Sequence, residues 1–246
     1  MNLVARIAGD TMKLTTVFLI GLILPVAVMT PVIGGARAEG FVDLRLGGSI
    51  TENAGNTVTA GPVGDTPQET SSATTGFEYG VSLGIGGGYW LNSVPWLGFA
   101  LNLSYFKANE NASEALKLDV HPISGLLMLR FPLLKSDTYP LGRLQPYFGI
   151  GPAAFVSKAE LEPTSTGLAG EFNDTSTDVG LYAQLGLKYF IDIPDLPGKS
   201  WGFFLEERFT RFDPSAFKDT VDVVPLEIDL DALNTWHTTV GLAFHF

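Results

Sequence analysis

Apolar and polar side chains alternate residue by residue along most of the chain after residue 38. In the final segment, 236–246, the even positions are mostly large and apolar, whereas the odd positions are small or polar. A period of two is typical of a β-strand whose two faces meet different surroundings. The pattern recurs in eight segments, which we predict to be strands: 41–50, 77–91, 97–106, 117–131, 146–156, 178–193, 201–210 and 236–246.

The fourth segment changes parity partway along its length. Leu118 and Val120 are even-numbered, whereas the large apolar residues of 123–131 fall mainly on odd positions. One extra residue at His121-Pro122 would return all of them to one face. A β-bulge inserts such a residue and tolerates proline, so we predict a bulge at this point.

Long and short connections alternate between the predicted strands. The connections at 51–76 and 159–176 are long, whereas Ser93-Val94-Pro95 and 134–144 are shorter. Long loops at one end and short turns at the other are typical of an up-and-down antiparallel barrel with an even number of strands.

The composition of the two faces indicates which one points inward. In a soluble barrel the large apolar face would point inward, and a soluble lipocalin-like barrel is the alternative. The opposite face here carries Gly, Ser and Ala mixed with charged residues, which suits the narrow interior of an eight-stranded barrel with lipid outside. We therefore predict an all-β fold, an eight-stranded antiparallel up-and-down transmembrane β-barrel. Aromatic residues near the short turns would form its interfacial girdle: Tyr89, Trp90, Trp96, Tyr189, Trp201 and Phe246.

Composition and charge exclude several other classes of protein. The net charge of −11 argues against a nucleic-acid partner, which would need a basic surface. The absence of cysteine excludes a disulfide scaffold, a cysteine-ligated metal site and a thiol nucleophile. We expect no cofactor and no metal site.

The first 38 residues are predicted to be a secretory signal peptide. An apolar run at 14–29 follows Lys13, and the small residues Ala36 and Ala38 mark a cleavage site after residue 38. Translation can also begin at Met12, which gives a more ordinary signal start. The alternative is a single membrane helix acting as an anchor, which Pro25 and Pro31 disfavour. The mature barrel would then span 39–246.

Three short segments resemble a known family. The alternating Val240, Leu242, Phe244 and Phe246 resemble the C-terminal signature of bacterial outer-membrane barrels. The segments 145–151 and 206–210 resemble the OmpA/OmpX-like small outer-membrane β-barrel family. We expect no peptidoglycan-binding domain after the last strand, as in the stand-alone members of that family.

This resemblance implies a location and a set of partners. The protein would lie in the outer membrane, in contact with lipid and lipopolysaccharide. Periplasmic chaperones and the barrel-assembly machinery would deliver it, with the last four outward residues as the assembly signal. We expect a monomer with both ends of the mature chain in the periplasm.

A cluster of charged residues is predicted inside the barrel. Counting from the short turns places Lys188, Glu206 and Arg208 at similar heights on the inward faces of neighbouring strands. Arg45 would reach the same carboxylate across Gly241, which has no side chain. We predict that Glu206 is held by Lys188, Arg208 and Arg45 and blocks the lumen, with the Lys188 contact better defined than the Arg45 contact.

Three functions are compatible with such a barrel. Lipid A deacylases of this size pair a His and a Ser on the lipid-facing surface, but no His-x-Ser occurs here, and His237 and His245 are predicted to point inward. OmpW-like barrels pass small hydrophobic molecules, whereas the inward aromatic residues of this chain favour a filled lumen: Phe106, Tyr147, Tyr182, Phe190 and Phe204. We predict a non-enzymatic structural or surface-interaction protein.

The long connections are strongly acidic, as between the last two predicted strands, where Asp219, Asp222, Glu227, Asp229 and Asp231 outnumber Lys218. Charge of this kind keeps loops solvated, and it also suits divalent-cation bridges to lipopolysaccharide.

Overall fold

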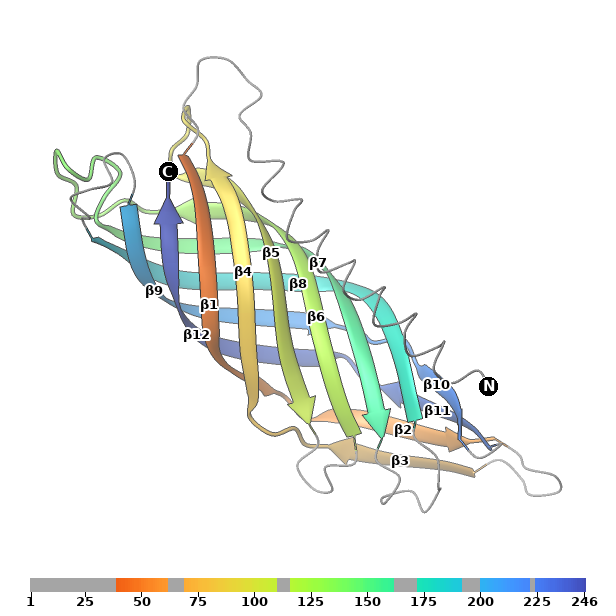
Figure 1. Cartoon of the computed structure of the whole chain (residues 1–246). Coiled ribbons are helices and arrows are strands. Elements are labelled where there is room, and N and C mark those ends of the chain that lie inside the picture. Colours follow the sequence, from red (N-terminus) through yellow and green to blue (C-terminus); the bar gives the residue numbers. More distant parts are fainter. Residues whose placement is uncertain (1–38, 62–68, 110–115, 162–171, 192–199, 222–223) are drawn as a thin grey trace, which may run out of the picture.

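The computed structural model describes residues 39–61, 69–109, 116–161, 172–191, 200–221 and 224–246. Eight strands form one closed barrel in the order β1-β12-β9-β8-β7-β6-β5-β4 (Figure 1). They are β1 (Glu39–Thr51), β4 (Gly80–Trp90), β5 (Leu97–Asn109), β6 (Leu116–Arg130), β7 (Leu144–Leu161), β8 (Phe172–Ile191), β9 (Ser200–Phe212) and β12 (Leu233–His245). These are the eight predicted segments, and the predicted fold class is confirmed.

The predicted signal peptide at 1–38, with Met12, Ala36 and Ala38, lies outside the described residues. Within the described residues, no helix is long and apolar enough to cross a membrane.

The first and last strands close the barrel. Arg45 of β1 stands opposite Gly241 of β12 on one side and opposite Gly84 of β4 on the other, and both pairings are antiparallel. Closure pairs the backbone of every barrel strand on both sides. A chain that spans hydrocarbon with strands requires this arrangement, because lipid offers no hydrogen bonds to an open edge.

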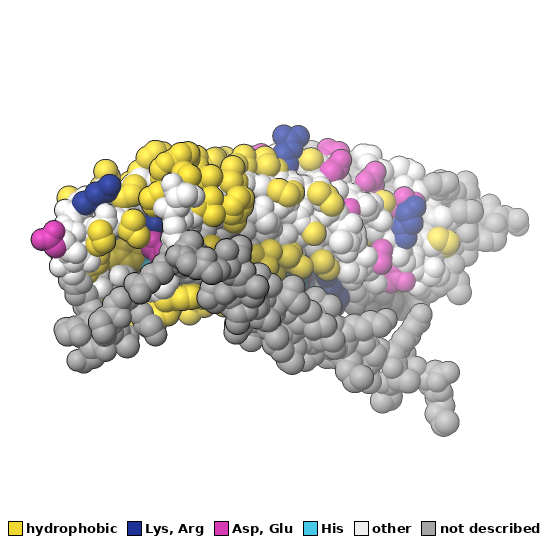
Figure 2. Space-filling view, turned by 90° about the horizontal axis from the view of Figure 1, so that it is seen from above, with side chains coloured by type: hydrophobic (Ala, Val, Ile, Leu, Met, Phe, Trp, Pro, Cys, Tyr) yellow, Lys and Arg dark blue, Asp and Glu magenta, His cyan; other side chains and the backbone are white. Residues whose placement is uncertain are grey.

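The half of the barrel nearest the C-terminus presents large apolar side chains outward, as predicted. Figure 2 shows hydrophobic side chains gathered over one part of the surface, with charged side chains beyond it. The exposed set comes from all eight strands and includes Leu44, Leu83, Phe99, Leu101, Leu127, Ile150, Leu185, Leu187, Phe203, Leu205, Val240 and Leu242.

The two faces exchange character in the other half of the barrel. Here large apolar side chains point inward and are buried, and the rings of Phe155 and Phe212 stack at 4.3 Å. Outward positions at this height carry the ion pair between Lys107 and Asp119, at 3.6 Å. This is the pattern of a strand in water, where the apolar face is buried in the protein. The buried set includes Phe106, Ala108, Leu118, Val120, Phe155, Ala159, Phe172 and Phe212.

The predicted bulge at His121-Pro122 is therefore wrong. β6 keeps one register with β5 through this region, and it keeps one register with β7. Val120 is buried inside the barrel, whereas Ile123 is exposed on its outer surface. The apolar residues change parity because the surroundings of the strand change, and no residue is inserted.

Two of the long connections form a second sheet, which the sequence pattern did not predict. It contains β2 (Ala54–Ala60), β3 (Glu69–Thr75), β10 (Phe217–Val221) and β11 (Val224–Leu230), in the order β10-β11-β2-β3. Figure 1 shows it at the end of the barrel opposite the C-terminus. Phe217, Leu226 and Ile228 are buried and join the apolar core of that end. Much of the predicted acidic loop surface therefore belongs to strands.

The short-turn end carries most of the predicted aromatic girdle. Trp96, Tyr189 and Phe246 are exposed on the outside. Trp90 is an exception, since it is 1% exposed and lies inside the barrel, with the Arg130 guanidinium 4.4 Å from its ring. Trp90 therefore makes a cation–π contact with a buried cation and does not lie at the membrane interface.

Candidate functional site

The Glu206 carboxylate lies inside the barrel and contacts residues of two other strands, β1 and β7, as well as Arg208 of its own strand. Arg45 Nε donates to Oε1 at 2.9 Å, and Tyr147 OH donates to Oε2 at 2.6 Å. Arg208 Nε lies 3.6 Å from Oε1, a longer ion contact from the same strand. All four side chains are nearly inaccessible to solvent. Charges buried to this degree require partners, because desolvation of an unpaired ion is costly.

Lys188 differs from the prediction. Its ammonium donates to both oxygens of Asp43, each at 2.8 Å, instead of to Glu206. Arg45 links the two carboxylates, since its Nη2 also lies 3.3 Å from Asp43 Oδ2. Asp43 has the inward parity of β1 and was the missing member of the cluster. The prediction defined the contact of Arg45 with Glu206 less well than that of Lys188. In the structure Arg45 is the residue that bonds directly to Glu206.

Polar side chains extend the cluster across the lumen towards the long-loop half. Arg208 donates to Tyr182 OH at 3.2 Å and to Ser82 Oγ at 2.7 Å. Arg45 Nη1 donates to Asn102 Oδ1 at 3.4 Å, and Asn102 donates to Gln184 at 3.0 Å. The network joins residues of β1, β4, β5, β8 and β9.

The five predicted inward aromatic residues, Phe106, Tyr147, Tyr182, Phe190 and Phe204, are all buried. The Phe204 ring occupies the space that a side chain at position 241 would need. The glycine therefore admits an aromatic ring from β9, and the Lys188 ammonium lies 5.7 Å from the centre of that ring.

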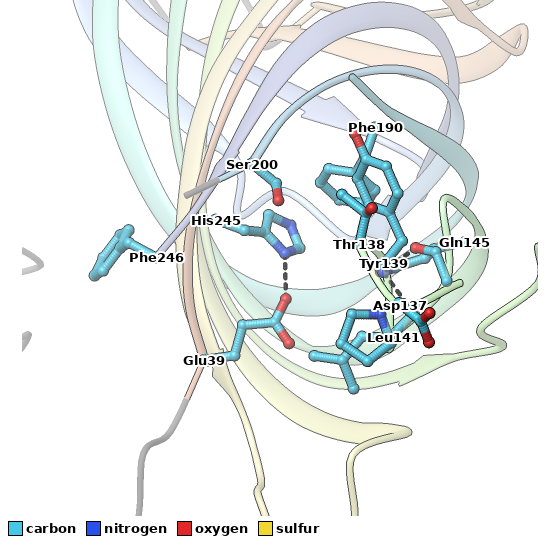
Figure 3. Close-up of a pocket in the computed structure, with 12 residues that line it drawn as sticks. Glu39, Asp137, Thr138, Tyr139, Leu141, Gln145, Phe190, Ser200, His245 and Phe246 are labelled. Carbon is cyan, nitrogen blue, oxygen red and sulfur yellow. Dashed lines mark hydrogen bonds and ion pairs between the residues drawn. The ribbon is translucent and has the colours of Figure 1, made fainter. Parts of the chain in front are cut away.

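A separate cavity of about 370 Å³ lies at the short-turn end of the barrel. Glu39 is held there by Arg130, whose Nη2 lies 2.6 Å from Oε2. The Oε1 of Glu39 lies 2.6 Å from His245 Nδ1 (Figure 3). Ser200 stands opposite His245 in the register and lines the same cavity.

The contacts of His245 define what this cavity can do chemically. Its Nε2 is buried and accepts no hydrogen bond from Ser200 or any other described residue. The acid, imidazole and hydroxyl therefore lie together without the Ser–His hydrogen bond that activates a nucleophile. Among the described residues, no group of three His, Asp or Glu side chains is placed to hold a metal ion.

The remaining predicted residues lie on the outer surface of β12 and just beyond it. Val240, Leu242 and Phe246 are exposed, and Phe244 packs beside Trp201 with ring centres 5.0 Å apart. Of the other histidines, His237 is buried inside as predicted, and His121 lies beside the Tyr105 ring.

Comparisons with known proteins agree with this architecture. A family model described as the outer membrane protein beta-barrel domain matches residues 22–244. The solved structure of OprG from Pseudomonas aeruginosa is similar at a TM-score of 0.51 and 14% identity, covering 87% of this chain and 99% of that one. Neisserial surface protein A is similar at a TM-score of 0.43 and 16% identity, covering 83% and 95%. No curated protein sequence matches the chain. At 14% identity the likeness to OprG shows a common fold.

Proposed function

The chain belongs to the outer membrane protein beta-barrel domain family, and we propose that it acts as a closed, non-enzymatic barrel that presents an acidic surface outside the cell. The observation that carries this proposal is the position of Glu206. A carboxylate bound by Arg45, Tyr147 and Arg208 leaves a small solute no open path through this level of the lumen. The apolar core of the long-loop half closes the barrel a second time.

The surface role rests on the second sheet. β2, β3, β10 and β11 extend the barrel beyond its lipid-facing half and carry exposed acidic residues such as Asp229. The sheet is fixed to the barrel through β8, since Asp174 accepts from Lys218 N at 2.7 Å and Asp219 accepts from Asn173 N at 3.0 Å. An acidic platform of this kind favours cationic partners and divalent-cation bridges to lipopolysaccharide.

The route to the membrane is part of the proposal. A signal peptide at 1–38, cleaved after Ala38, would direct export. Periplasmic chaperones and the barrel-assembly machinery would then receive the chain through the outward pattern of Val240, Leu242, Phe244 and Phe246. The assembled barrel would be a monomer surrounded by lipid and lipopolysaccharide, with no nucleic-acid partner and no cofactor.

Surface proteolysis tests the orientation. We expect a specific protease site inserted at 62–68 to be cut on intact cells, because the proposal places that end of the barrel outside. The same site inserted after Asp137, in the turn between β6 and β7, should be cut only after the outer membrane is opened. Cleavage confined to the Asp137 insertion on intact cells would invert the proposed orientation.

A further inference from the structure

Glu207 is an acid on the lipid-facing side of the barrel. It is exposed on the outward face of β9, between Leu205 and Phe209. Its neighbours across the strands are Leu185 of β8 and Thr238 of β12. No hydrogen bond or ion pair joins Glu207 to any residue that the structure describes.

The depth of Glu207 makes this position unusual. The exposed Leu205 and Phe203 lie on one side of it along β9, and on the other side Phe209 packs against Trp236 with ring centres 4.9 Å apart. One outward apolar residue, Phe209, therefore separates it from the exposed Arg211, and Glu207 lies in the loop-side part of the apolar band. Ionisable residues in contact with hydrocarbon are costly and rare, and they normally mark a site where a partner is bound.

Two hydroxyl groups lie beside Glu207 on the outer surface, over the neighbouring strands β12 and β1. Thr238 stands directly opposite Glu207, and Gly48 stands opposite Thr238 on the next strand, β1. The Tyr79 hydroxyl occupies the space that a side chain on Gly48 would fill. A carboxyl and two hydroxyl groups thus form a row across β9, β12 and β1.

An apolar groove of about 530 Å³ runs beside this row. Its outward-facing walls are Leu44 and Leu46 of β1, Phe203 of β9, and Val240 and Leu242 of β12. Leu46 and Val240 pair with each other one step from the Gly48–Thr238 pair, so the groove begins where the polar row ends. A groove with one polar end and an apolar length has the shape and chemistry of a lipid chain with its attachment group.

We propose that this groove binds one acyl chain of lipopolysaccharide, whose amide N–H or hydroxyl group donates a hydrogen bond to Glu207. The chain lies along Leu46, Val240 and Phe203, and its polar end reaches the row of hydroxyl groups. A second copy of the protein is a poorer occupant, because a symmetric contact centred here would bring two Glu207 carboxylates together. The inference rests on the proposed orientation, which the protease-site insertions test separately.

Native mass spectrometry of the purified protein in a mild detergent tests the site. We expect the wild type to retain one added lipid A molecule, and Glu207→Leu to weaken that binding about tenfold. Glu207→Gln keeps an acceptor oxygen and should retain most of the affinity. Val240→Trp fills the groove and should weaken binding without altering the carboxyl group.

Two controls make the result specific. Glu227→Leu removes an acid from β11, outside the lipid-facing band, and should leave binding unchanged. Urea unfolding of each variant shows that it is folded, and Glu207→Leu should be at least as stable as the wild type. Equal lipid A binding by wild type and Glu207→Leu would overturn the proposal. So would phosphatidylethanolamine binding with the same dependence on Glu207, or a wild-type dimer that Glu207→Leu abolishes.

Discussion

Glu206→Ala is expected to lower the free energy of unfolding by about 3–5 kcal/mol, because it leaves buried cations without their carboxylate. Arg208 would keep only the neutral partners Tyr182 and Ser82. Arg45 would keep Asp43 at 3.3 Å but lose its 2.9 Å bond to Glu206, and the Tyr147 hydroxyl would lose its acceptor. Urea unfolding of the refolded protein in vesicles measures the loss.

Arg45→Ala is the matched comparison for this prediction. It leaves Glu206 in contact with Arg208 and Tyr147, and it leaves Asp43 in contact with Lys188. Each carboxylate keeps a cation, so the loss should be clearly smaller than for Glu206→Ala. A loss as large as or larger than that of Glu206→Ala would show that the carboxylate is not the centre of the cluster.

Phe155→Ala is expected to destabilise the protein by about 3–5 kcal/mol, the usual cost of removing a buried phenylalanine ring. Phe155 is fully buried in the long-loop half and stacks on Phe212 at 4.3 Å. If this half were lined by polar side chains around water, as in an open channel, the same truncation would have a small effect.

Val156→Ala is the control at the same height on the same strand. Val156 points to the outer surface opposite His121, where the truncated methyl groups are already partly in water. We expect a change within about 0.5 kcal/mol, as for most surface substitutions. Urea unfolding compares the pair directly, and similar losses for both would contradict the exchange of faces along the barrel.

The lipid-facing half could be predicted from the sequence because large apolar residues point outward, and small or polar residues inward, along each of its strands. Most outward positions in this half, such as Leu44 and Val240, carry large exposed apolar side chains, so period and parity together define strands, faces and closure. The long-loop half could not be predicted in this way, because there the inward face is apolar. The change of parity at His121-Pro122 looks the same in the sequence whether a residue is inserted or the surroundings change.

The second sheet was missed for a different reason. β2 reads AGNTVTA and β3 reads ETSSATT, so small and polar residues hide the alternation. β2 pairs with β11, whose buried Ile228 and Leu230 are distant in the sequence, and β3 pairs with β2.

In the lumen, counting residues placed Lys188 and Glu206 on the correct face. It could not show whether Lys188 would bind the carboxylate of Glu206 or that of Asp43. That choice depends on the stagger between strands that are far apart in the sequence, and the same stagger brings Asp43 to Lys188.

Planar-bilayer conductance of the refolded wild-type protein tests the proposed closed lumen most directly. The pairing of Glu206 with Arg45, together with the buried aromatic residues on either side, predicts no current steps above the bare bilayer under conditions where an open porin conducts. Reproducible single-channel steps from the wild-type protein would contradict a closed lumen and favour transport.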